Sequence, residues 1–500
     1  MEIYSFKPFL AIVASLLGAI LIVATRKKPS LREGCSIAAG IAQLVIILSM
    51  VSAVLNGGTL RFTLSSFIPQ VSIAFRVDAL ALLFAATASF LWIVTIFYSI
   101  GYMRLHREQN QTRFYAAVAL TLTATMGIAF AANLFTLYLF YEALTFSTYP
   151  LVTHTGTEEA YAAGKRYIAY HLGTSIAFLL PAIIITYTLS GTFDFRPQGV
   201  FSAGANTTLL VVLYFLFLAG AAKAALVPFH AWLPAAMVAP VPVSSLLHAV
   251  AVVNAGVFLI FRVILDVFGR DLFQQLNLGI ATAVIASITI MLASFYALRL
   301  DNLKALLAYS TIGQLAYMIL GASLPNQTGE TGGLIHIVNH SFSKITLFFA
   351  AGSILLASHK TKISEMTGLG RFLPWTLGAF TVGSLSIIGI PPTAGFVTKY
   401  FLAIGSIQSG WLAVFFVLLV STLLSAAYYL RVVRTVFFGS PPEHDNAARG
   451  EDEGQPHAAL HPTGEVSPFI VAPMLLTAGI AVVLGLFPNL VLVLVRQVFR

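Results

Sequence analysis

The sequence predicts an all-α integral membrane protein of about fourteen transmembrane helices. Of its 500 residues, 58% are hydrophobic and only 9% are charged, whereas a soluble domain has about 45–50% apolar and about 25% charged residues. Apolar stretches of roughly 20 residues, long enough to cross a bilayer, recur along nearly the whole chain. A water-soluble fold is excluded because it could not bury so much apolar surface.

Hydropathy and turn residues place the spans along the chain. The basic cluster Arg26-Lys27-Lys28 follows the first span and no basic run precedes it, so we expect this span to be a retained helix rather than a cleaved signal peptide. The predicted spans are residues 8–25, 35–55, 79–102, 114–130, 132–152, 167–190, 207–235, 242–265, 273–298, 303–322, 332–357, 373–406, 409–436 and 467–490.

Most of the 28 Lys and Arg residues follow odd-numbered spans. This asymmetry predicts that those loops are cytoplasmic and that both termini lie on the other side of the cell inner (plasma) membrane. It also accounts for the net charge of +9, so nothing indicates nucleic-acid binding. The predicted parts are N-terminal spans (1–112), a core (113–440), a polar cytoplasmic linker (441–466) and a last span (467–500).

The single cysteine, Cys35, provides no thiolate cluster for zinc or iron–sulfur ligation. The histidines of the linker, His444, His457 and His461, lack a regular spacing for metal ligands. We therefore predict no cofactor and no metal site, and any redox chemistry is expected to belong to a partner protein.

Two predicted spans contain proline at depth: Pro228 in the seventh span, and Pro391 and Pro392 in the twelfth. Proline removes a backbone donor, so a broken transmembrane helix survives only where neighbours or water satisfy the freed carbonyls. The breaks lie five spans apart. This spacing predicts two inverted five-helix repeats, spans 4–8 and spans 9–13.

Four charged residues lie away from the ends of spans and are flanked by apolar residues: Glu142, Lys223, Lys344 and Lys399. A lone charge at mid-bilayer costs about 2.5–3.5 kcal/mol on insertion scales. A single ion pair between Glu142 and Lys223 is expected on these grounds, yet it leaves two lysines without a carboxylate. Burial favours the neutral form of a lysine, and a lysine that releases its proton is a relay site. We therefore interpret the four residues as a proton relay.

Histidines extend the predicted relay. His336, His340 and Lys344 recur every four residues and so share one helix face, with steps of about 6 Å along the axis. Imidazole titrates near neutral pH and passes protons in either direction. His248 is a further candidate within a span, and Lys304, at the start of another, is either a proton-entry residue or a lysine extending to the surface.

Five ordered motifs resemble those of the antiporter-like subunits of respiratory complex I, Mrp-type cation/proton antiporters and membrane-bound hydrogenases. The resemblance implies that Glu142 pairs with Lys223, that Lys344 lies on the central axis and that Lys399 is the terminal lysine. Many Mrp D-type relatives have a lysine where Asn254 stands, so the central step is expected to depend on His248. The motifs are Tyr141-Glu142, the run 223–234 followed by 239–244, the run 303–317, the His336/His340/Lys344 stripe and the run 389–399.

These observations predict a subunit that translocates protons, or exchanges protons for a cation such as Na⁺, together with other membrane subunits. The subunit resembles an Mrp D-like or hydrogenase-associated subunit. Two alternatives stay open at this point. One is the membrane subunit of an inorganic-carbon (bicarbonate or CO2) uptake system. The other is a self-contained solute transporter, for which the sequence offers one buried acid and no evident substrate pocket.

Overall fold

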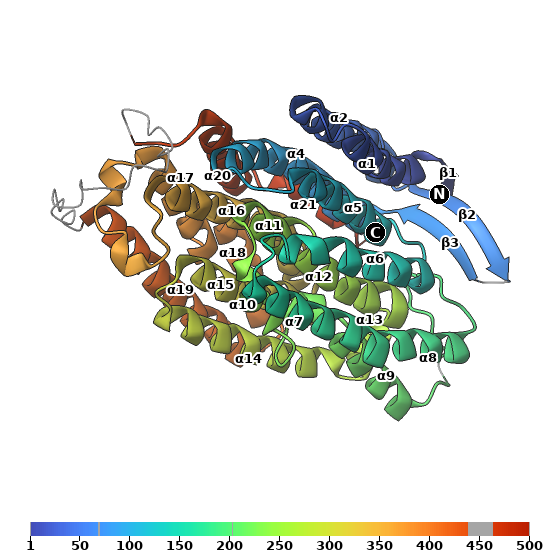
Figure 1. Ribbon diagram of the computed structural model, residues 1–500. Coiled ribbons are helices and arrows are strands. Elements are labelled where there is room, and N and C mark those ends of the chain that lie inside the picture. The colour runs from blue at the N-terminus through green and yellow to red at the C-terminus, as the bar shows by residue number, and fades with distance from the viewer. Residues whose placement is uncertain (1, 69–70, 203, 439–463, 500) are drawn as a thin grey trace, which may run out of the picture.

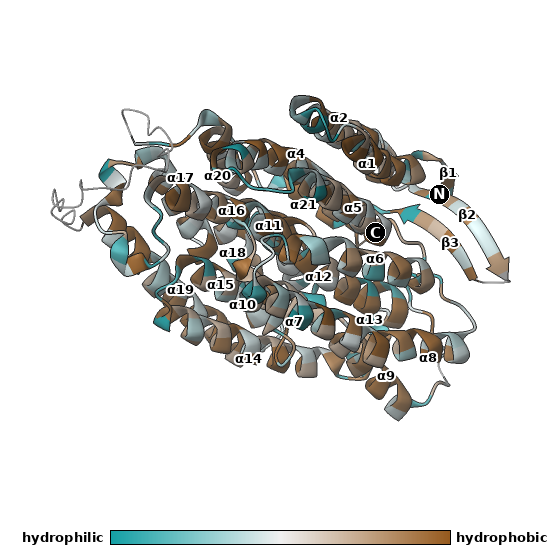
Figure 2. Cartoon of the chain, viewed as in Figure 1, coloured by the Kyte–Doolittle hydropathy of each residue, from teal (hydrophilic) through white to brown (hydrophobic). Residues whose placement is uncertain are grey.

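The computed structural model describes residues 2–68, 71–202, 204–438 and 464–499, and it is a bundle of long helices whose axes run in roughly the same direction (Figure 1). Hydrophobic residues cover these helices along most of their length (Figure 2). Among the described residues, ten helices are long and apolar enough to cross a membrane. The predicted multi-pass, mostly helical membrane protein is therefore confirmed, whereas the exact number of crossings stays a prediction.

Each predicted span contains helix. In the first half the helices are α1 (Lys7–Ala24), α2 (Pro29–Leu48), α3 (Val51–Leu55), α4 (Ala79–Leu105), α5 (Gln111–Ala129), α6 (Leu134–Val152), α7 (Glu158–Thr174), α8 (Leu180–Ser190), α9 (Thr207–Gly220), α10 (Trp232–Ala235), α11 (Val241–Ser245) and α12 (Val252–Arg262). In the second half they are α13 (Arg270–Gln275), α14 (Leu278–Arg299), α15 (Leu303–Ser323), α16 (Gln327–Ser358), α17 (Pro374–Ile388), α18 (Ala394–Gln408), α19 (Leu412–Phe438), α20 (Pro468–Leu486) and α21 (Asn489–Gln497).

The two proline-containing spans are broken, as expected. Residues 221–231 separate α9 from α10, and residues 389–393 separate α17 from α18. Freed carbonyls find side-chain donors in both places: the indole of Trp232 donates to the carbonyl of Ala222 at 3.0 Å, and Lys399 donates to the last carbonyl of α17 at 2.7 Å. Side chains thus satisfy the backbone where the helices are interrupted.

The segment between the second and third predicted spans is a hairpin that the sequence analysis did not anticipate. β2 (Thr59–Ile68) pairs antiparallel with β3 (Val71–Val77) and parallel with β1 (Glu2–Tyr4). Phe62 lies opposite Phe75 in this sheet, and both are buried. The apolar and polar residues alternate here with the period of a strand rather than of a helix. The fold is therefore helical with one small sheet.

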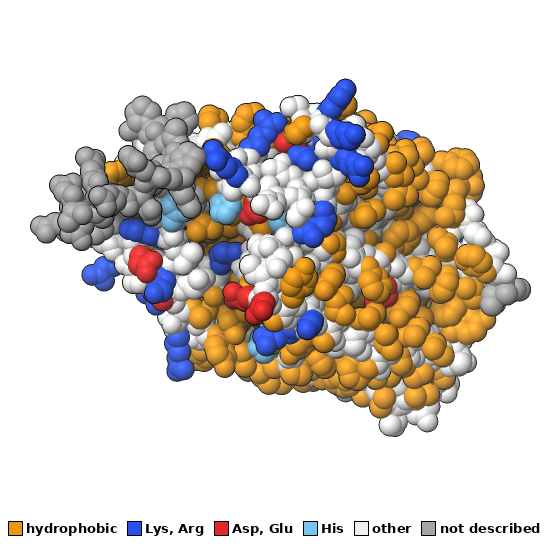
Figure 3. Space-filling view, viewed as in Figure 1, with side chains coloured by type: hydrophobic (Ala, Val, Ile, Leu, Met, Phe, Trp, Pro, Cys, Tyr) orange, Lys and Arg blue, Asp and Glu red, His pale blue; other side chains and the backbone are white. Residues whose placement is uncertain are grey.

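Both chain ends lie near this sheet, in the right half of Figure 1. Gln497 in α21 donates to the carbonyl of Leu55 in α3 at 3.1 Å, which ties the last helix to the first part of the chain. On the face shown in Figure 3, charged side chains gather at the top and in the left half of the molecule, away from the sheet. Of the predicted linker, 441–466, only residues 464–466 are described, so its three histidines lie outside the described residues.

Three helices of the second half meet at glycines. A Cβ atom on Gly321 of α15 would lie 2.6 Å from the Cα of Gly333 in α16. A Cβ atom on Gly405 of α18 would lie equally close, 2.6 Å, to the Cα of Gly329 in α16. Only glycine allows such close approach of helix backbones within a membrane. Helix α16 is therefore held in backbone contact with a neighbour on each of two sides.

A buried charge cluster joins the start of α4 to the end of α12. Arg262 donates to Asp78 and to Asp266 at 2.7 Å each. Arg76 of β3 also bonds Asp78, at 2.7 Å. Because two arginines face two carboxylates, the charges balance, and the guanidinium of Arg262 is only 1% exposed. The cluster fixes the sheet and α4 against α12.

Replacing Arg262 by methionine is expected to destabilise the protein by about 3–5 kcal/mol, because it leaves the carboxylates of Asp78 and Asp266, whose side chains are 17% and 7% exposed, facing a single arginine. The check is the melting temperature of the purified protein in mild detergent. The matched control is Lys362→Ala, which removes an ion pair with Glu365 whose side chains are 62% and 48% exposed and which should cost less than about 1 kcal/mol. Equal melting temperatures for the two variants would contradict this account.

Candidate functional site

The first predicted relay residues, Glu142 and Lys223, lie close together but do not form the expected ion pair among the described residues. Buried Lys223 donates to the hydroxyl of Thr145 in α6 at 2.7 Å. Its ammonium also lies 3.6 Å from the ring centroid of Tyr141. Glu142 instead accepts a hydrogen bond from Ser175. The prediction of direct pairing is wrong because a hydroxyl and an aromatic face satisfy the lysine, and a second hydroxyl satisfies the carboxylate.

Short π-helical turns present two of the polar residues. Ser175 begins η1 (Ser175–Leu179), between α7 and α8, and His248 lies in η4 (Leu246–Val250), between α11 and α12. Such turns are rare and occur frequently at functional sites, because the extra residue changes the direction of nearby side chains. Both turns lie on segments that surround the charged residues. They therefore mark the part of the bundle around Glu142, Lys223 and His248 as the candidate site.

His248 is fully buried, and its ring packs on Phe348 of α16 with the centroids 4.9 Å apart. In the described part of the chain, neither ring nitrogen has a hydrogen-bond partner. Asn254 donates to the carbonyl of Ala249 at 2.9 Å and to Ser341 at 3.1 Å. The side chain of Asn254 is therefore held by neutral groups, and His248 is the titratable side chain of this segment.

His336, His340 and Lys344 all lie on α16. His336 bonds Gln314 of α15 at 2.9 Å through one nitrogen and Thr398 of α18 at 3.2 Å through the other. The rings of His336 and His340 are 5.8 Å apart between centroids. Both nitrogens of His340 lack a partner within the described ranges. The α16 stripe therefore contacts both the α15 and the α18 side of the bundle.

Hydroxyl groups also hold the other two lysines, buried Lys344 and half-buried Lys399. Lys344 donates to Ser310 at 2.9 Å and to Tyr429 at 3.2 Å. Lys399 donates to Thr422 at 2.9 Å, besides its bond to the end of α17. No carboxylate pairs with these lysines or with Lys223 in the ranges that the structure describes. Neutral oxygen atoms are thus the common partners of all three.

Lys304 donates to the carbonyl of Ala239 at 2.7 Å, just before α11. Its side chain is therefore directed at the backbone of another segment rather than extended along the surface into water. This geometry favours the proton-entry interpretation over the surface one, and the role itself stays a prediction.

One buried titratable residue near the site was missed by the sequence analysis. His171 of α7 is only 1% exposed, and its ring lies 4.2 Å from that of Trp232 between centroids. Its signal in the sequence was a single histidine inside a predicted span, without the four-residue spacing that singled out the histidines of α16.

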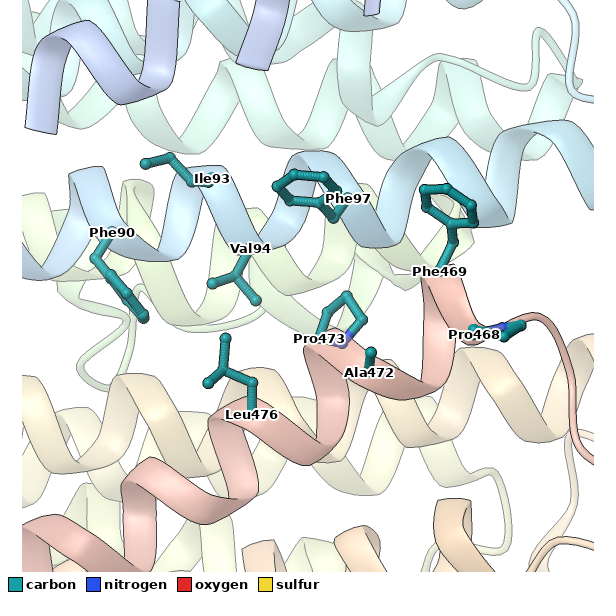
Figure 4. Close-up of a pocket in the computed structure, with 9 residues that line it drawn as sticks. All are labelled: Phe90, Ile93, Val94, Phe97, Pro468, Phe469, Ala472, Pro473 and Leu476. Atoms are coloured by element: carbon teal, nitrogen blue, oxygen red, sulfur yellow. The ribbon is translucent and has the colours of Figure 1, made fainter. Parts of the chain in front are cut away.

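Away from these residues, an open apolar cavity of about 560 Å³ lies between α4 and α20. In Figure 4 the side chains of Phe90 and Val94 on α4 face Leu476 and Pro473 on α20. None of the lining side chains carries a hydrogen-bonding group. The cavity therefore offers nothing to orient a polar solute. Its residues are Phe90, Ile93, Val94, Phe97, Pro468, Phe469, Ala472, Pro473 and Leu476.

The fold and the site define a multi-pass membrane protein with buried titratable side chains in both halves of its helical bundle. The family described as "NADH:quinone oxidoreductase/Mrp antiporter, TM" matches residues 131–425, and the family described as "NADH-Ubiquinone oxidoreductase (complex I), chain 5 N-terminus" matches residues 64–115. The chain belongs to the NADH:quinone oxidoreductase/Mrp antiporter transmembrane family. The resemblance inferred from the five motifs is thereby confirmed.

Similar proteins include subunits of respiratory complexes. NADH-quinone oxidoreductase subunit N of Desulforudis audaxviator is 29% identical over 484 residues, which is 96% of this chain and 94% of that protein. NADH-quinone oxidoreductase subunit L of Escherichia coli is 31% identical over 393 residues, and the match covers 77% of this chain but only 62% of that longer protein.

Two solved structures share the fold. A chain of the Mrp complex from Dietzia sp. DQ12-45-1b has a TM-score of 0.85 at 24% identity, with 99% of this chain and 96% of that chain covered. A chain of the membrane-bound sulfane sulfur reductase, an archaeal respiratory membrane complex, has a TM-score of 0.84 at 24% identity, with 99% and 97% covered. The helical architecture is therefore shared along nearly the whole chain.

Proposed function

We propose that this chain translocates protons, alone or in exchange for another cation, as one membrane subunit of a multisubunit antiporter or redox-driven ion pump. The observation that carries the proposal is the series of buried or half-buried lysines and buried histidines, with hydroxyl partners for the lysines, in both halves of the bundle. A structural role alone would not require three uncompensated lysines at such a desolvation cost.

The proposed path starts at Glu142 and Lys223, continues through His248 and the histidines of α16 to Lys344, and ends at Lys399. Lys304 is the proposed entry. A hydroxyl oxygen accepts a hydrogen bond from an ammonium and from a neutral amine alike. A lysine bound to Thr145, or to Ser310, therefore keeps its hydrogen bond when it releases a proton.

Interactions between neighbouring sites supply the proposed coupling. A proton that arrives at one lysine raises the free energy of a proton on the next, since like charges repel in a medium of low dielectric constant. Water is expected to bridge the gaps that exceed one hydrogen bond. Lys223 is hydrogen-bonded to Thr145, which lies one helical turn from Glu142. We propose that a change in the side-chain rotamer of Lys223 alone makes and breaks its contact with Glu142.

The proposed setting follows from the relatives. Their names describe subunits of NADH-quinone oxidoreductases, and the similar structures come from Mrp and respiratory membrane complexes. We propose that this chain likewise assembles with other membrane subunits in the plasma membrane and that redox chemistry, where present, belongs to those partners. The basic loops are proposed to be cytoplasmic, with both termini on the other side, and residues 113–440 to be the core with two inverted repeats.

The test is proton movement in vesicles that contain the intact complex, followed with a pH-sensitive dye. Glu142→Gln should slow transport about tenfold, since it removes a proton acceptor but leaves the Ser175 side chain and water at one end of the path. The matched control is Glu159→Gln, an exposed residue in the first turn of α7, which should transport normally. Equal rates for wild type and Glu142→Gln would remove the first step of the proposed path.

Two alternative functions make different predictions in the same vesicles. A subunit for inorganic-carbon uptake would move protons only when bicarbonate or CO2 is supplied. A solute transporter would need no partner subunits and would require a polar binding site, for which the apolar cavity between α4 and α20 is unsuited. Proton movement by the intact complex without either substrate favours the proposed function.

A further inference from the structure

His171 lies where the first part of the proposed path meets α7. Its ring is in edge-to-face contact with Tyr167, at 4.3 Å between centroids, and with Trp232 of α10, at 4.2 Å. Trp232 in turn donates to the carbonyl of Ala222, the residue before Lys223. The imidazole is thus packed directly against the side chain that holds the break around Lys223.

Three polar residues recur every four positions along α7 and into η1: Tyr167, His171 and Ser175. Residues at this spacing share one face of a helix, about 6 Å apart along the axis. All three are buried. Ser175 donates to Glu142, so one end of this row touches the carboxylate of the proposed path.

The other end of the row returns to α6. The hydroxyl of Tyr167 bonds Thr148 at 2.6 Å. Thr148 lies one turn from Thr145, the residue that accepts the hydrogen bond of Lys223. Tyr167 is also the member of the row nearest to residues 153–157, which connect α6 to α7 and are proposed to be cytoplasmic. The row therefore extends from the side of this connection to both Glu142 and Lys223.

Packing alone does not account for an imidazole at this position. Neither nitrogen of the ring has a hydrogen-bond partner among the described residues. A buried polar group without a partner costs about 1–3 kcal/mol, whereas phenylalanine would make the same ring contacts at no such cost. A group retained despite this cost, beside a lysine and a carboxylate of the path, is a functional candidate.

We propose that His171 is a further proton-carrying residue, which accepts protons from the side of the α6–α7 connection and passes them to Glu142 and Lys223. The proposal rests on the proposed function. Each transfer moves one proton from a protonated donor to a free imidazole nitrogen and then from the other nitrogen to the next acceptor, so the ring returns to its neutral form after a change of tautomer.

The experiment compares three variants of the intact complex in vesicles: His171→Phe, His171→Gln and His171→Glu. Phe preserves the ring contacts, Gln preserves polarity, and Glu alone can carry a proton. We expect Phe and Gln to slow proton transport at least about tenfold and Glu to recover part of the rate, because proton transfer through a side chain contributes about 100-fold or more in comparable steps. The matched control is His359→Phe, an exposed histidine at the end of α16.

The order of the variants separates a proton carrier from a packing residue. A packing role predicts the highest rate for Phe and the lowest for Glu, and that order would overturn the proposal. If His171→Phe or His171→Gln fails to assemble, the remaining variant and His171→Glu still give opposite orders of rate under the two roles. If His171→Glu fails to assemble, near-normal transport by Phe overturns the proposal, and equally slow transport by Phe and Gln supports it. If His171→Phe transports normally while Lys344→Met does not, this inference fails and the proposed function stands. If neither variant affects transport, the proposed function fails as well.

Discussion

Lys344→Met is expected to reduce proton transport at least about 100-fold, because it removes a proton-binding group from the middle of the proposed path. The complex should nevertheless assemble. Ser310 and Tyr429, which hold the ammonium, also bond each other at 2.8 Å, so neither hydroxyl is left unpaired when the lysine is absent. Since a buried ammonium costs about 2.5–3.5 kcal/mol on insertion scales, the variant should melt no lower than wild type.

The measurement pairs vesicle transport with the melting temperature of the purified complex. Lys360→Met serves as the matched control, because Lys360 lies just beyond the end of the same helix, outside the proposed path. It should leave both transport and melting temperature unchanged. Transport by Lys344→Met at more than half the wild-type rate would show that protons bypass this lysine.

Lys399→Met should abolish transport to a similar extent, about 100-fold, but it should also destabilise the protein. The ammonium of Lys399 is a donor to the carbonyl of Ile388 at the break between α17 and α18. Methionine leaves that carbonyl without this bond, which costs about 1–3 kcal/mol. The two lysines thus differ in their expected effect on the stability of the wild-type protein: Lys344 lowers it, and Lys399 raises it.

Lys399→Gln distinguishes the two roles of this residue. The amide of glutamine can donate to the same carbonyl, but it cannot accept a proton from the path. We expect the melting temperature to recover relative to Lys399→Met while transport stays absent. If Gln restored transport together with stability, Lys399 would be a structural residue rather than a relay residue.

Much of the helical architecture was predictable because a membrane-spanning helix leaves a long apolar run in the sequence. The breaks were predictable because proline marks them. The hairpin formed by β2 and β3 was not, since the spans were located by their long apolar runs and the polar residues of this segment, such as Arg61 and Arg76, were interpreted as belonging to a loop. Alternation such as that of residues 59–68 is the signal that could have identified it.

The site was predictable in composition but not in its contacts. Sequence position indicates the depth of a side chain in the membrane, yet it does not indicate which neighbour the terminal group of that side chain contacts. Glu142 and Lys223 were therefore expected to pair with each other. In the structure Ser175 donates a hydrogen bond to Glu142, and Thr145 accepts one from Lys223. A hydroxyl is common in apolar helices and carries no charge, so nothing in the sequence marked these two as the partners.

The glycine contacts of α16 have a mechanical consequence. An alternating-access machine needs a surface on which one group of helices slides or tilts past another. At Gly321 and Gly333, and at Gly329 and Gly405, the main chains already touch, so a tilt of α16 toward either neighbour would drive backbone atoms into each other. The helix that bears His336, His340 and Lys344 is thus restrained against tilting toward α15 or α18. In the proposed complex, we therefore expect partner subunits to act on this helix through side-chain rotation, water and charge rather than through a tilt of α16.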